Sequence, residues 1–227
     1  YGDHRDLHRV DRRQRQMCIR DSSHLVELYG IKYVISVTPI EDPRFELVYA
    51  RIEGLEGRKE DLLKENTIKL YQNKSPLSRA WLVRDFQIMD ALAVRSTLTS
   101  KEFEPDKMVL LEEVPPTLTL PLKERGKGEV AFLSASNNRL SLRVETETES
   151  LLVLNDSHYP GWRAFVNGEE KKILRANYHF RAVVLPKGTH KIEFLYSPFS
   201  LKLGGALTFL GILGCLSGWM VQRHYRI

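Results

Sequence analysis

Short runs of strand-forming residues recur along positions 31–196, and several of them alternate apolar and polar residues with the two-residue period of half-buried β-strands. The first half predicts strands at 31–37, 44–50, 67–71, 78–86 and 107–112, and helices at 23–29 and 87–97. The second half predicts strands at 129–136, 139–147, 150–155, 162–166, 170–174, 178–185 and 190–196. We therefore expect a mainly β chain, with an α+β first part followed by a β-sandwich-like domain.

Turn residues separate the later strands in the way that β-hairpins require. Asn167-Gly168 is the strongest of these signals, because both residues tolerate a positive φ angle. Residues 186–189 connect the last two strands with similar turn chemistry. The apolar run at 31–37 predicts a buried strand. Threonine and glutamate alternate over 144–149, which favours an edge strand protected against pairing with other chains.

Two prolines mark the boundary between the two β regions. Val114-Pro115-Pro116 cannot continue a central strand and stiffens the backbone. We therefore predict an α+β region at 23–113, a linker at 114–127 and the β-sandwich-like domain at 128–198. The charged stretch 54–65 is expected to be a solvated loop or a short helix.

The last long segment has the composition of a membrane span. Residues 203–221 contain no charged side chain, and about nineteen residues cross most of a bilayer's hydrocarbon core. We place a transmembrane helix at 201–221. Gly214 and Gly218 put small residues four positions apart, which is typical of a face that packs against another membrane helix. Other spans are therefore expected as partners, together with the lipid bilayer.

Basic residues after this segment predict its orientation. Arg223 and Arg226 follow the span at once, and positive charge favours the cytoplasmic side, although Lys202 lies on the other flank. The tail at 222–227 is therefore expected to be cytoplasmic and the β regions extracytoplasmic.

The first 22 residues do not resemble the rest of the chain. They show no apolar period, and Arg12 to Ser22 matches the translation of a transposon sequencing adapter, with Tyr1 to His8 matching the flow-cell end of the same adapter. We interpret 1–22 as a disordered, artefactual tract and leave it out of the fold argument, in preference to a basic nucleic-acid-binding arm. The encoded protein is then expected to begin near Ser23, in the middle of a longer protein.

The composition and the motifs of the sequence exclude several classes of functional site. Lysine and arginine number 34 against 29 acidic residues, but the first 22 residues hold six arginines against four aspartates, so part of the net charge of +5 lies in that tract. Without Cys18, Cys215 is the one cysteine left, which predicts neither a disulfide framework nor a cysteine metal site. The sequence has no phosphate loop, dinucleotide-binding glycine motif or zinc spacing. We expect no cofactor, no metal and no nucleic-acid partner.

Two arrangements that could suggest catalysis or metal binding are set aside. Asp156, Ser157 and His158 contain the side chains of a nucleophilic triad, but consecutive loop residues point apart. His158, His179 and His190 come from separate elements and lack the carboxylates that support metal-bound histidines, which favours half-exposed histidines.

The loop after strand 150–155 is the better candidate for a binding site. Asn155, Asp156, Tyr159 and Trp162 supply an amide, a carboxylate, a phenol and an indole, which suit sugar hydroxyls or a partner protein. A second group of residues could meet lipid phosphates near a bilayer: Arg163, Arg175 and Arg181, with Lys171 and Lys172. The alternative is that the aromatic residues are core and the arginines are a solvated rim.

The same residues carry a resemblance to the YfhO family of bacterial membrane proteins. It rests on the runs 152–164, 175–183, 185–190 and 196–198, on the Asn167-Gly168 turn, and on 29–36. The run around Pro160-Gly161-Trp162 is the most specific part. His158 stands where tyrosine is common in the family, and Asn167 where aspartate is common.

The resemblance implies a multi-spanning protein of the bacterial cell membrane. Such proteins are similar in plan to membrane glycosyltransferases that use polyprenyl-phosphate-linked sugars and decorate cell-envelope polymers. Their catalytic carboxylates lie on early extracytoplasmic loops, so no catalytic residue is carried over to this chain. The chain is then expected to be an inactive C-terminal part of such an enzyme, with a glycan or lipid-linked sugar as ligand. The alternative is a noncatalytic, membrane-anchored module that binds glycan or a protein partner.

Overall fold

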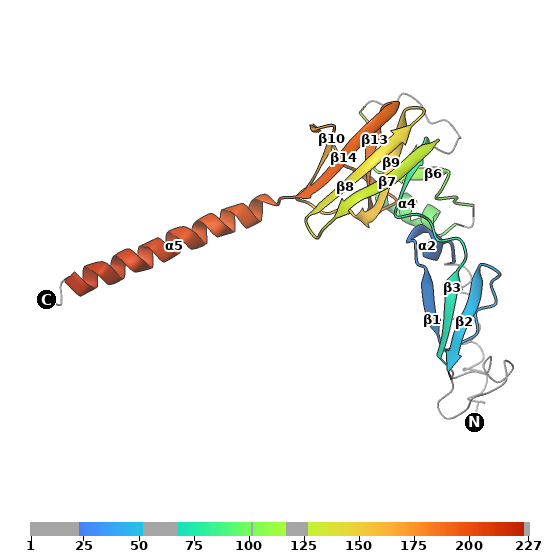
Figure 1. Cartoon of the computed structure of the whole chain (residues 1–227), viewed down its shortest axis with the longest axis horizontal. Helices are drawn as coiled ribbons and strands as arrows, with labels where there is room; N and C mark the ends of the chain where they lie inside the picture. Colours follow the sequence, from blue (N-terminus) through green and yellow to red (C-terminus); the bar gives the residue numbers. More distant parts are fainter. Residues whose placement is uncertain (1–22, 52–67, 101, 117–126, 225–227) are drawn as a thin grey trace.

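The computed structural model describes residues 23–51, 68–100, 102–116 and 127–224 (Figure 1). Its helices are α2 (Ser23–Leu28), α4 (Ala91–Leu98) and α5 (Phe199–His224). The first strands are β1 (Tyr33–Ser36), β2 (Phe45–Arg51), β3 (Ile68–Asn73), β4 (Ala80–Val83), β5 (Asp85–Ile88) and β6 (Met108–Leu111). The later strands are β7 (Gly128–Ala135), β8 (Arg139–Thr146), β9 (Ser150–Ser157), β10 (Trp162–Val166), β11 (Glu169–Lys171), β12 (Leu174–Ala176), β13 (Phe180–Leu185) and β14 (Gly188–Tyr196). The predicted mainly β fold with one long C-terminal helix is confirmed.

Two of the sheets pack face to face as a β-sandwich. One has the strand order β11-β10-β14-β8-β7, and the other has the order β4-β9-β13-β12-β6-β5. Leu142, Ile192 and Phe194 of the first sheet meet Leu152 and Val183 of the second, and none of the five has exposed surface. Burial of these large apolar side chains supplies the main driving force for packing the sheets together.

The other face of the six-stranded sheet forms a second core with the two short helices. Leu28 of α2 and Val94 of α4 pack there against Val153. Asp90 starts α4 as its N-cap, and its carboxylate accepts hydrogen bonds of 2.9 Å from the backbone of Leu92 and Ala93. Because β9 is covered on both faces of its sheet, its first half is a continuous apolar run.

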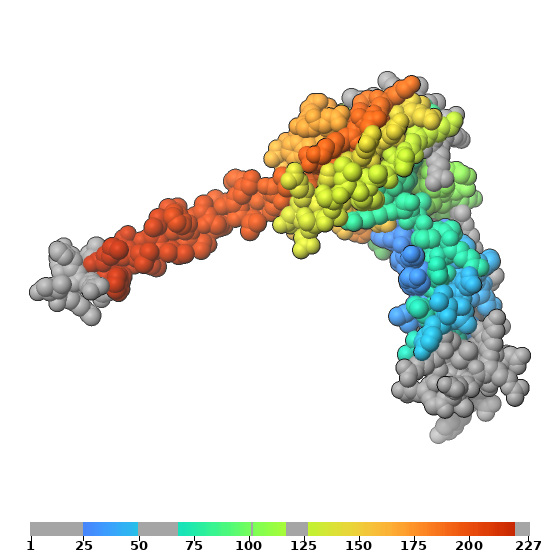
Figure 2. Space-filling view, in the orientation of Figure 1, coloured from blue at the N-terminus to red at the C-terminus, as the bar shows by residue number. Residues whose placement is uncertain are grey.

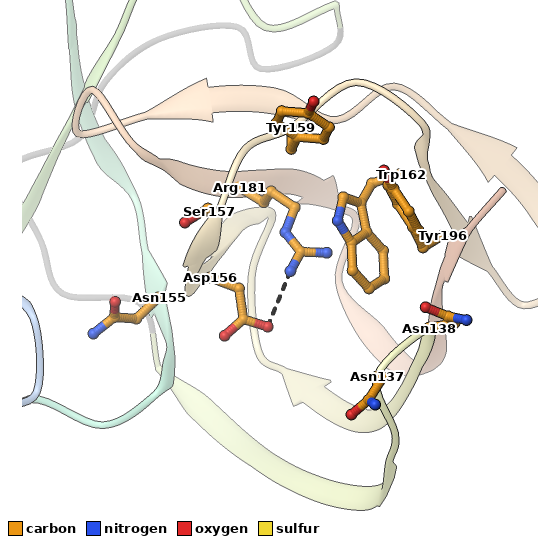
Figure 3. Close-up of a pocket in the computed structure, with 9 residues that line it drawn as sticks. All are labelled: Asn137, Asn138, Asn155, Asp156, Ser157, Tyr159, Trp162, Arg181 and Tyr196. Carbon is orange, nitrogen blue, oxygen red and sulfur yellow. Dashed lines mark hydrogen bonds and ion pairs between the residues drawn. The ribbon is translucent and has the colours of Figure 1, made fainter. Parts of the chain in front are cut away.

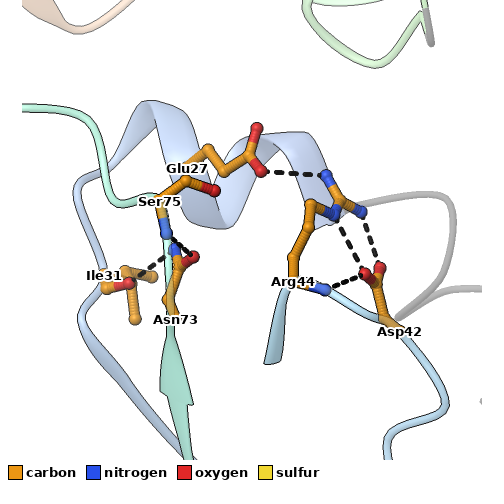
Figure 4. Close-up of polar contacts among 6 residues, drawn as sticks. All are labelled: Glu27, Ile31, Asp42, Arg44, Asn73 and Ser75. Carbon is orange, nitrogen blue, oxygen red and sulfur yellow. Dashed lines mark hydrogen bonds and ion pairs between the residues drawn. The ribbon is translucent and has the colours of Figure 1, made fainter. Parts of the chain in front are cut away.

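The smaller sheet, with the order β1-β3-β2, is joined to α2 by polar contacts. Arg44 donates to Asp42 at 2.7 and 3.0 Å and to Glu27 at 3.2 Å (Figure 4). Asn73 donates to the carbonyl of Ile31 at 3.0 Å and accepts from the backbone of Ser75 at 3.1 Å. These contacts hold α2 and the segment after it against the three-stranded sheet.

Two expectations about individual strands are wrong. β1 is not buried: Tyr33 is 50% and Ile35 73% exposed, because the three-stranded sheet leaves one face open. An unbroken apolar run does not distinguish a strand that is buried on both faces from a strand that is exposed on one face. The strand ending at Thr146 is not at an edge, since β8 pairs with both β7 and β14. In β8, Glu145 is exposed and Val144 is buried. The alternation of threonine and glutamate therefore indicates that one face of the strand is exposed, and does not show whether the strand lies at the edge of its sheet.

The predicted strand at 78–86 is two strands. β4 pairs with β9, and after Arg84 β5 pairs in parallel with β6. β4, β5 and β6 all precede the predicted linker at 114–127, yet their sheet is completed by strands that follow it. One sheet therefore contains strands from both β regions, while the division into domains stays a prediction.

Helix α5 leaves the sandwich directly after β14 and stands clear of it (Figure 2). Phe199–Met220 is long and apolar enough to cross a membrane, and none of it is buried inside the protein. An apolar helix exposed on every side is unstable in water and suits a lipid or helical environment. The expectations for residues 1–22 and 54–65 lie outside the described residues, as do those for 225–227.

Candidate functional site

A hollow of about 570 Å³ (Figure 3) is lined in part by Tyr196, the last residue of β14, and so lies at the end of the sandwich from which α5 emerges. The end of β9, the loop after it and the start of β10 form one side. Arg181 of β13, Tyr196 of β14 and the turn between β7 and β8 complete it. The lining residues are Asn137, Asn138, Asn155, Asp156, Ser157, Tyr159, Trp162, Arg181 and Tyr196.

The loop between β9 and β10 takes its shape from Gly161. Its φ angle is +103°, a conformation that side-chain-bearing residues rarely adopt. The Gly161 carbonyl accepts a hydrogen bond of 2.8 Å from the backbone of Ser197, and an added Cβ would lie only 2.9 Å from Pro198. The Pro-Gly-Trp sequence thus lets the loop fold against the segment that leads into α5, which fixes Trp162 at the rim of the hollow.

Asp156 is the acidic group of the hollow, and it is held by two arginines. Arg79 donates to its carboxylate twice, each time at 3.0 Å, and Arg181 donates once, also at 3.0 Å. Arg79 is half-exposed, whereas the Arg181 side chain is only 3% exposed. One carboxylate therefore compensates two guanidinium groups.

Arg181 lies beneath the aromatic part of the hollow. Its guanidinium carbon is 4.0 Å from the ring centroid of Trp162 and 5.2 Å from that of Phe194, which are cation–π distances. Desolvation by burial, opposed by the Asp156 charge, lowers the pKa of Arg181 to about 10. Arg181 is therefore still charged at neutral pH.

Three aromatic side chains line the same opening. Trp162 and Tyr196 have ring centroids 5.2 Å apart and pair across β10 and β14. Tyr159 lies 6.5 Å from Tyr196 and is 62% exposed. Apolar ring faces beside amide and carboxylate groups can bind a ligand that has both apolar faces and hydroxyls.

The structure brings five of the predicted site residues together and leaves two apart. Asn155, Asp156, Tyr159, Trp162 and Arg181 all line the hollow. The Asn155 side chain is also structural, since it donates to the carbonyl of Leu28 at 3.1 Å and turns away from the centre of the hollow (Figure 3).

Arg163 and Arg175 lie outside the hollow with partners of their own. Arg163 donates to Glu170 at 2.7 Å across the β10–β11 hairpin. Arg175 donates to the carbonyl of Tyr178 at 2.6 Å and pairs with Glu112. The two lysines beside them are also paired, Lys171 with Glu169 and Lys172 with Glu113. These basic residues form separate surface ion pairs and not one cluster.

Sequence reasoning missed Asn137, Asn138 and Tyr196. The two asparagines lie in the turn between β7 and β8, and Tyr196 is the last residue of β14. Long-range pairing of β8 with β14 brings them beside the loop, and the backbone of Tyr196 donates to the Asn138 carbonyl at 2.8 Å. The sequence signal that could have indicated them is the Asn137-Asn138 turn, since two adjacent amides can bind a ligand, together with an aromatic residue, Tyr196, at the end of a strand.

The histidines have structural contacts. His190 Nε2 lies 2.8 Å from the Pro186 carbonyl, which can only accept, so Nδ1 accepts from the Asn167 amide at 3.1 Å. Burial and the nearby charges of Arg175 and Arg181 lower the pKa of His158. Among the described residues, no three or more histidine, cysteine, aspartate or glutamate side chains are grouped so that they could hold a metal ion.

Comparison with known proteins agrees with the sequence motifs. Residues 80–208, more than half of the chain, match the family model described as bacterial membrane protein YfhO. The chain is 25% identical over 111 residues to "Uncharacterized protein YfhO" of Bacillus subtilis (strain 168), covering 49% of this chain and 13% of the relative. No solved structure matches the chain. The matched segment contains every described strand from β4 to β14, and the chain belongs to the YfhO family of bacterial membrane proteins.

Proposed function

We propose that this chain is the extracytoplasmic β region and a membrane span of a YfhO-type glycosyltransferase, with the hollow as a binding surface for the glycan or the lipid-linked sugar. The enzyme would transfer sugars from a polyprenyl phosphate to cell-envelope polymers, and its catalytic residues would lie in other parts of a larger protein. The observation that carries the proposal is the hollow itself, with two tyrosines, a tryptophan and three asparagines around one Asp–Arg pair.

The chemistry of the lining supports a sugar ligand. Asn137 and Asn138 offer amide donors and acceptors for hydroxyl groups, while Trp162 and Tyr159 offer apolar faces for a pyranose ring. The location supports a ligand held close to the bilayer, because Tyr196 precedes the start of α5 at Phe199 by only three residues. The chain covers only 13% of the Bacillus relative, which leaves room for catalytic loops elsewhere in such a protein.

A second candidate is a noncatalytic, membrane-anchored module that binds glycan or a protein partner. The hollow suits this second function equally well, because neither the enzyme nor the noncatalytic module needs a catalytic residue in the hollow. The two candidates differ in what happens when the hollow is blocked in the intact membrane protein. Loss of sugar transfer from a radiolabelled polyprenyl-phosphate sugar supports the enzyme, and unchanged transfer with lost glycan binding supports the module.

Binding can be tested with the full chain in a polyoxyethylene detergent, which carries neither sugar nor phosphate. The chain has three tryptophans, so the Trp162 indole resonance can be assigned by comparison with Trp162→Phe. Neutral disaccharides of hexose and N-acetylhexosamine are the probes. A saturable shift of the Trp162 indole, with no shift of the buried Trp81, supports the proposal. No shift of Trp162 with any disaccharide contradicts a glycan site here.

A further inference from the structure

Arg181 has more hydrogen-bonding capacity than its surroundings use. The residue is only 2% exposed, and one of its nitrogens, Nη2, donates to Asp156. The other two nitrogens, Nε and Nη1, are buried without a hydrogen-bond partner. A buried donor that has given up water without gaining a partner destabilises the folded state, and more so when it is charged. The fold therefore holds a group whose donors are satisfied only if something else binds.

The charge of the hollow points to the kind of group that is missing. Asp156 is shared by Arg79 and Arg181, so these three side chains carry a net charge of +1. The other lining residues are asparagine, serine, tyrosine and tryptophan, which are neutral at pH 7. A ligand with one additional negative charge would balance the site and supply acceptors for the unpartnered donors.

Trp162 controls access to these donors. It is half-buried, it lines the hollow, and its ring lies against the guanidinium of Arg181 (Figure 3). Since Nε and Nη1 have almost no surface of their own, a ligand reaches them only when a neighbouring side chain shifts. Trp162 is the stacked side chain on the open side, so its indole should report on binding.

The position of the hollow points to the source of the ligand. The loop carrying Trp162 is hydrogen-bonded from Gly161 to Ser197, two residues before α5 begins at Phe199. A ligand in the hollow is therefore close to the end of the apolar segment Phe199–Met220. Phosphate groups are the anions that are abundant at such a surface.

We propose that Arg181, covered by Trp162, is the anchor of a subsite for a phosphate group at the membrane surface, carried either by a lipid or by a soluble phosphorylated compound. The inference rests on the proposed function in taking the hollow as a ligand site, and it adds an anionic portion to the ligand. Arginine suits this role because its nitrogens stay protonated and donate to phosphate oxygens.

The test uses the full chain in the same polyoxyethylene detergent and follows the Trp162 indole resonance. Inorganic phosphate is titrated in one arm, and mixed micelles containing phosphatidylglycerol in another. Arg181→Met removes the charge from the hollow. Arg163→Met is the matched control, because it removes an arginine from the same domain that is paired with Glu170 outside the hollow.

We expect either probe to shift Trp162 saturably, with binding at least about 10-fold weaker in Arg181→Met and unchanged in Arg163→Met. A response to inorganic phosphate identifies a soluble phosphate as sufficient, and a response only to phosphatidylglycerol identifies a lipid headgroup. The Trp81 resonance reports whether each variant is folded, and Arg181→Lys, which keeps the charge, should retain part of the response.

Three results would overturn the inference. If neutral disaccharides shift Trp162 but neither phosphate probe does, the anion subsite is wrong and the glycan site stands. If both arginine variants weaken binding equally, the effect is general surface charge. A complete lack of response to phosphates and sugars alike removes the proposed function as well.

Discussion

Asp156 accepts two hydrogen bonds of 3.0 Å from Arg79, a residue 77 positions earlier in the chain. The pairing of β4 with β9 makes this possible, because it places Ala80 opposite Leu154. Asp156 is therefore compensated even without Arg181. This arrangement separates the stability role of the carboxylate from the role of the buried arginine.

Arg181→Met should leave stability within about 1 kcal/mol of the wild type or raise it, because methionine replaces a desolvated charge with apolar volume while Asp156 keeps Arg79. Asp156→Ala should cost about 2–4 kcal/mol, since it leaves buried Arg181 without its carboxylate. Urea unfolding in detergent, followed by the Trp81 indole resonance, measures both. Equal destabilisation by the two substitutions would mean that Arg181 is retained for stability and not for binding.

Gly161→Ala should destabilise the loop by about 2–3 kcal/mol, because it combines an unfavourable backbone angle with a steric clash. The added Cβ would lie 2.9 Å from the Cβ and 3.1 Å from the Cα of Pro198, so the backbone there would have to shift. Gly168→Ala is the matched control: its φ angle is also positive, at +88°, but its added Cβ meets nothing within 4 Å. It should cost only about 1 kcal/mol. Thermal unfolding by circular dichroism distinguishes the two, and equal losses would contradict the predicted clash.

The pH dependence of stability should include a contribution from His158, whose pKa is lowered from 6.5 in the folded protein. Below this value the unfolded chain binds a proton that the folded site resists, so the free energy of unfolding falls as the pH falls. Above it both states are neutral and the contribution disappears. His158→Gln should therefore lose less stability than the wild type between about pH 7.5 and about pH 5, measured as urea midpoints. Parallel losses would show that burial near Arg175 and Arg181 does not affect this histidine.

Local signals predicted the strands well, because each depends on neighbouring residues. Asn167-Gly168 forms the expected two-residue turn, with φ angles of 53° and 88°, between β10 and β11. Long-range properties were harder. Neither the open face of β1 nor the central place of β8 follows from alternation, since both depend on which strands pair with which.

In the candidate site, too, the residues that are close in sequence were predicted, and several of those brought together by strand pairing were not. Asp156, Tyr159 and Trp162 lie within seven residues of one another, so one loop signal found them all. Arg79 and Tyr196 join them only through long-range strand pairing, of β4 with β9 in one sheet and of β10 with β14 in the other. The shared carboxylate, and with it the unpartnered nitrogens of Arg181, could not be predicted without that pairing.

Orientation in the membrane is the last prediction. If the β region is extracytoplasmic, Lys187→Cys in the turn before β14 should react with a membrane-impermeant maleimide in intact bacterial cells that produce the protein. The variant is made in a Cys18→Ser, Cys215→Ser background, because these are the chain's two cysteines. Cys215 lies within Phe199–Met220, so with only Cys18 replaced it should stay unlabelled while the bilayer is intact and react after detergent is added. Labelling of Lys187→Cys only after lysis would reverse the orientation, and labelling of Cys215 in intact cells would exclude α5 as a membrane span.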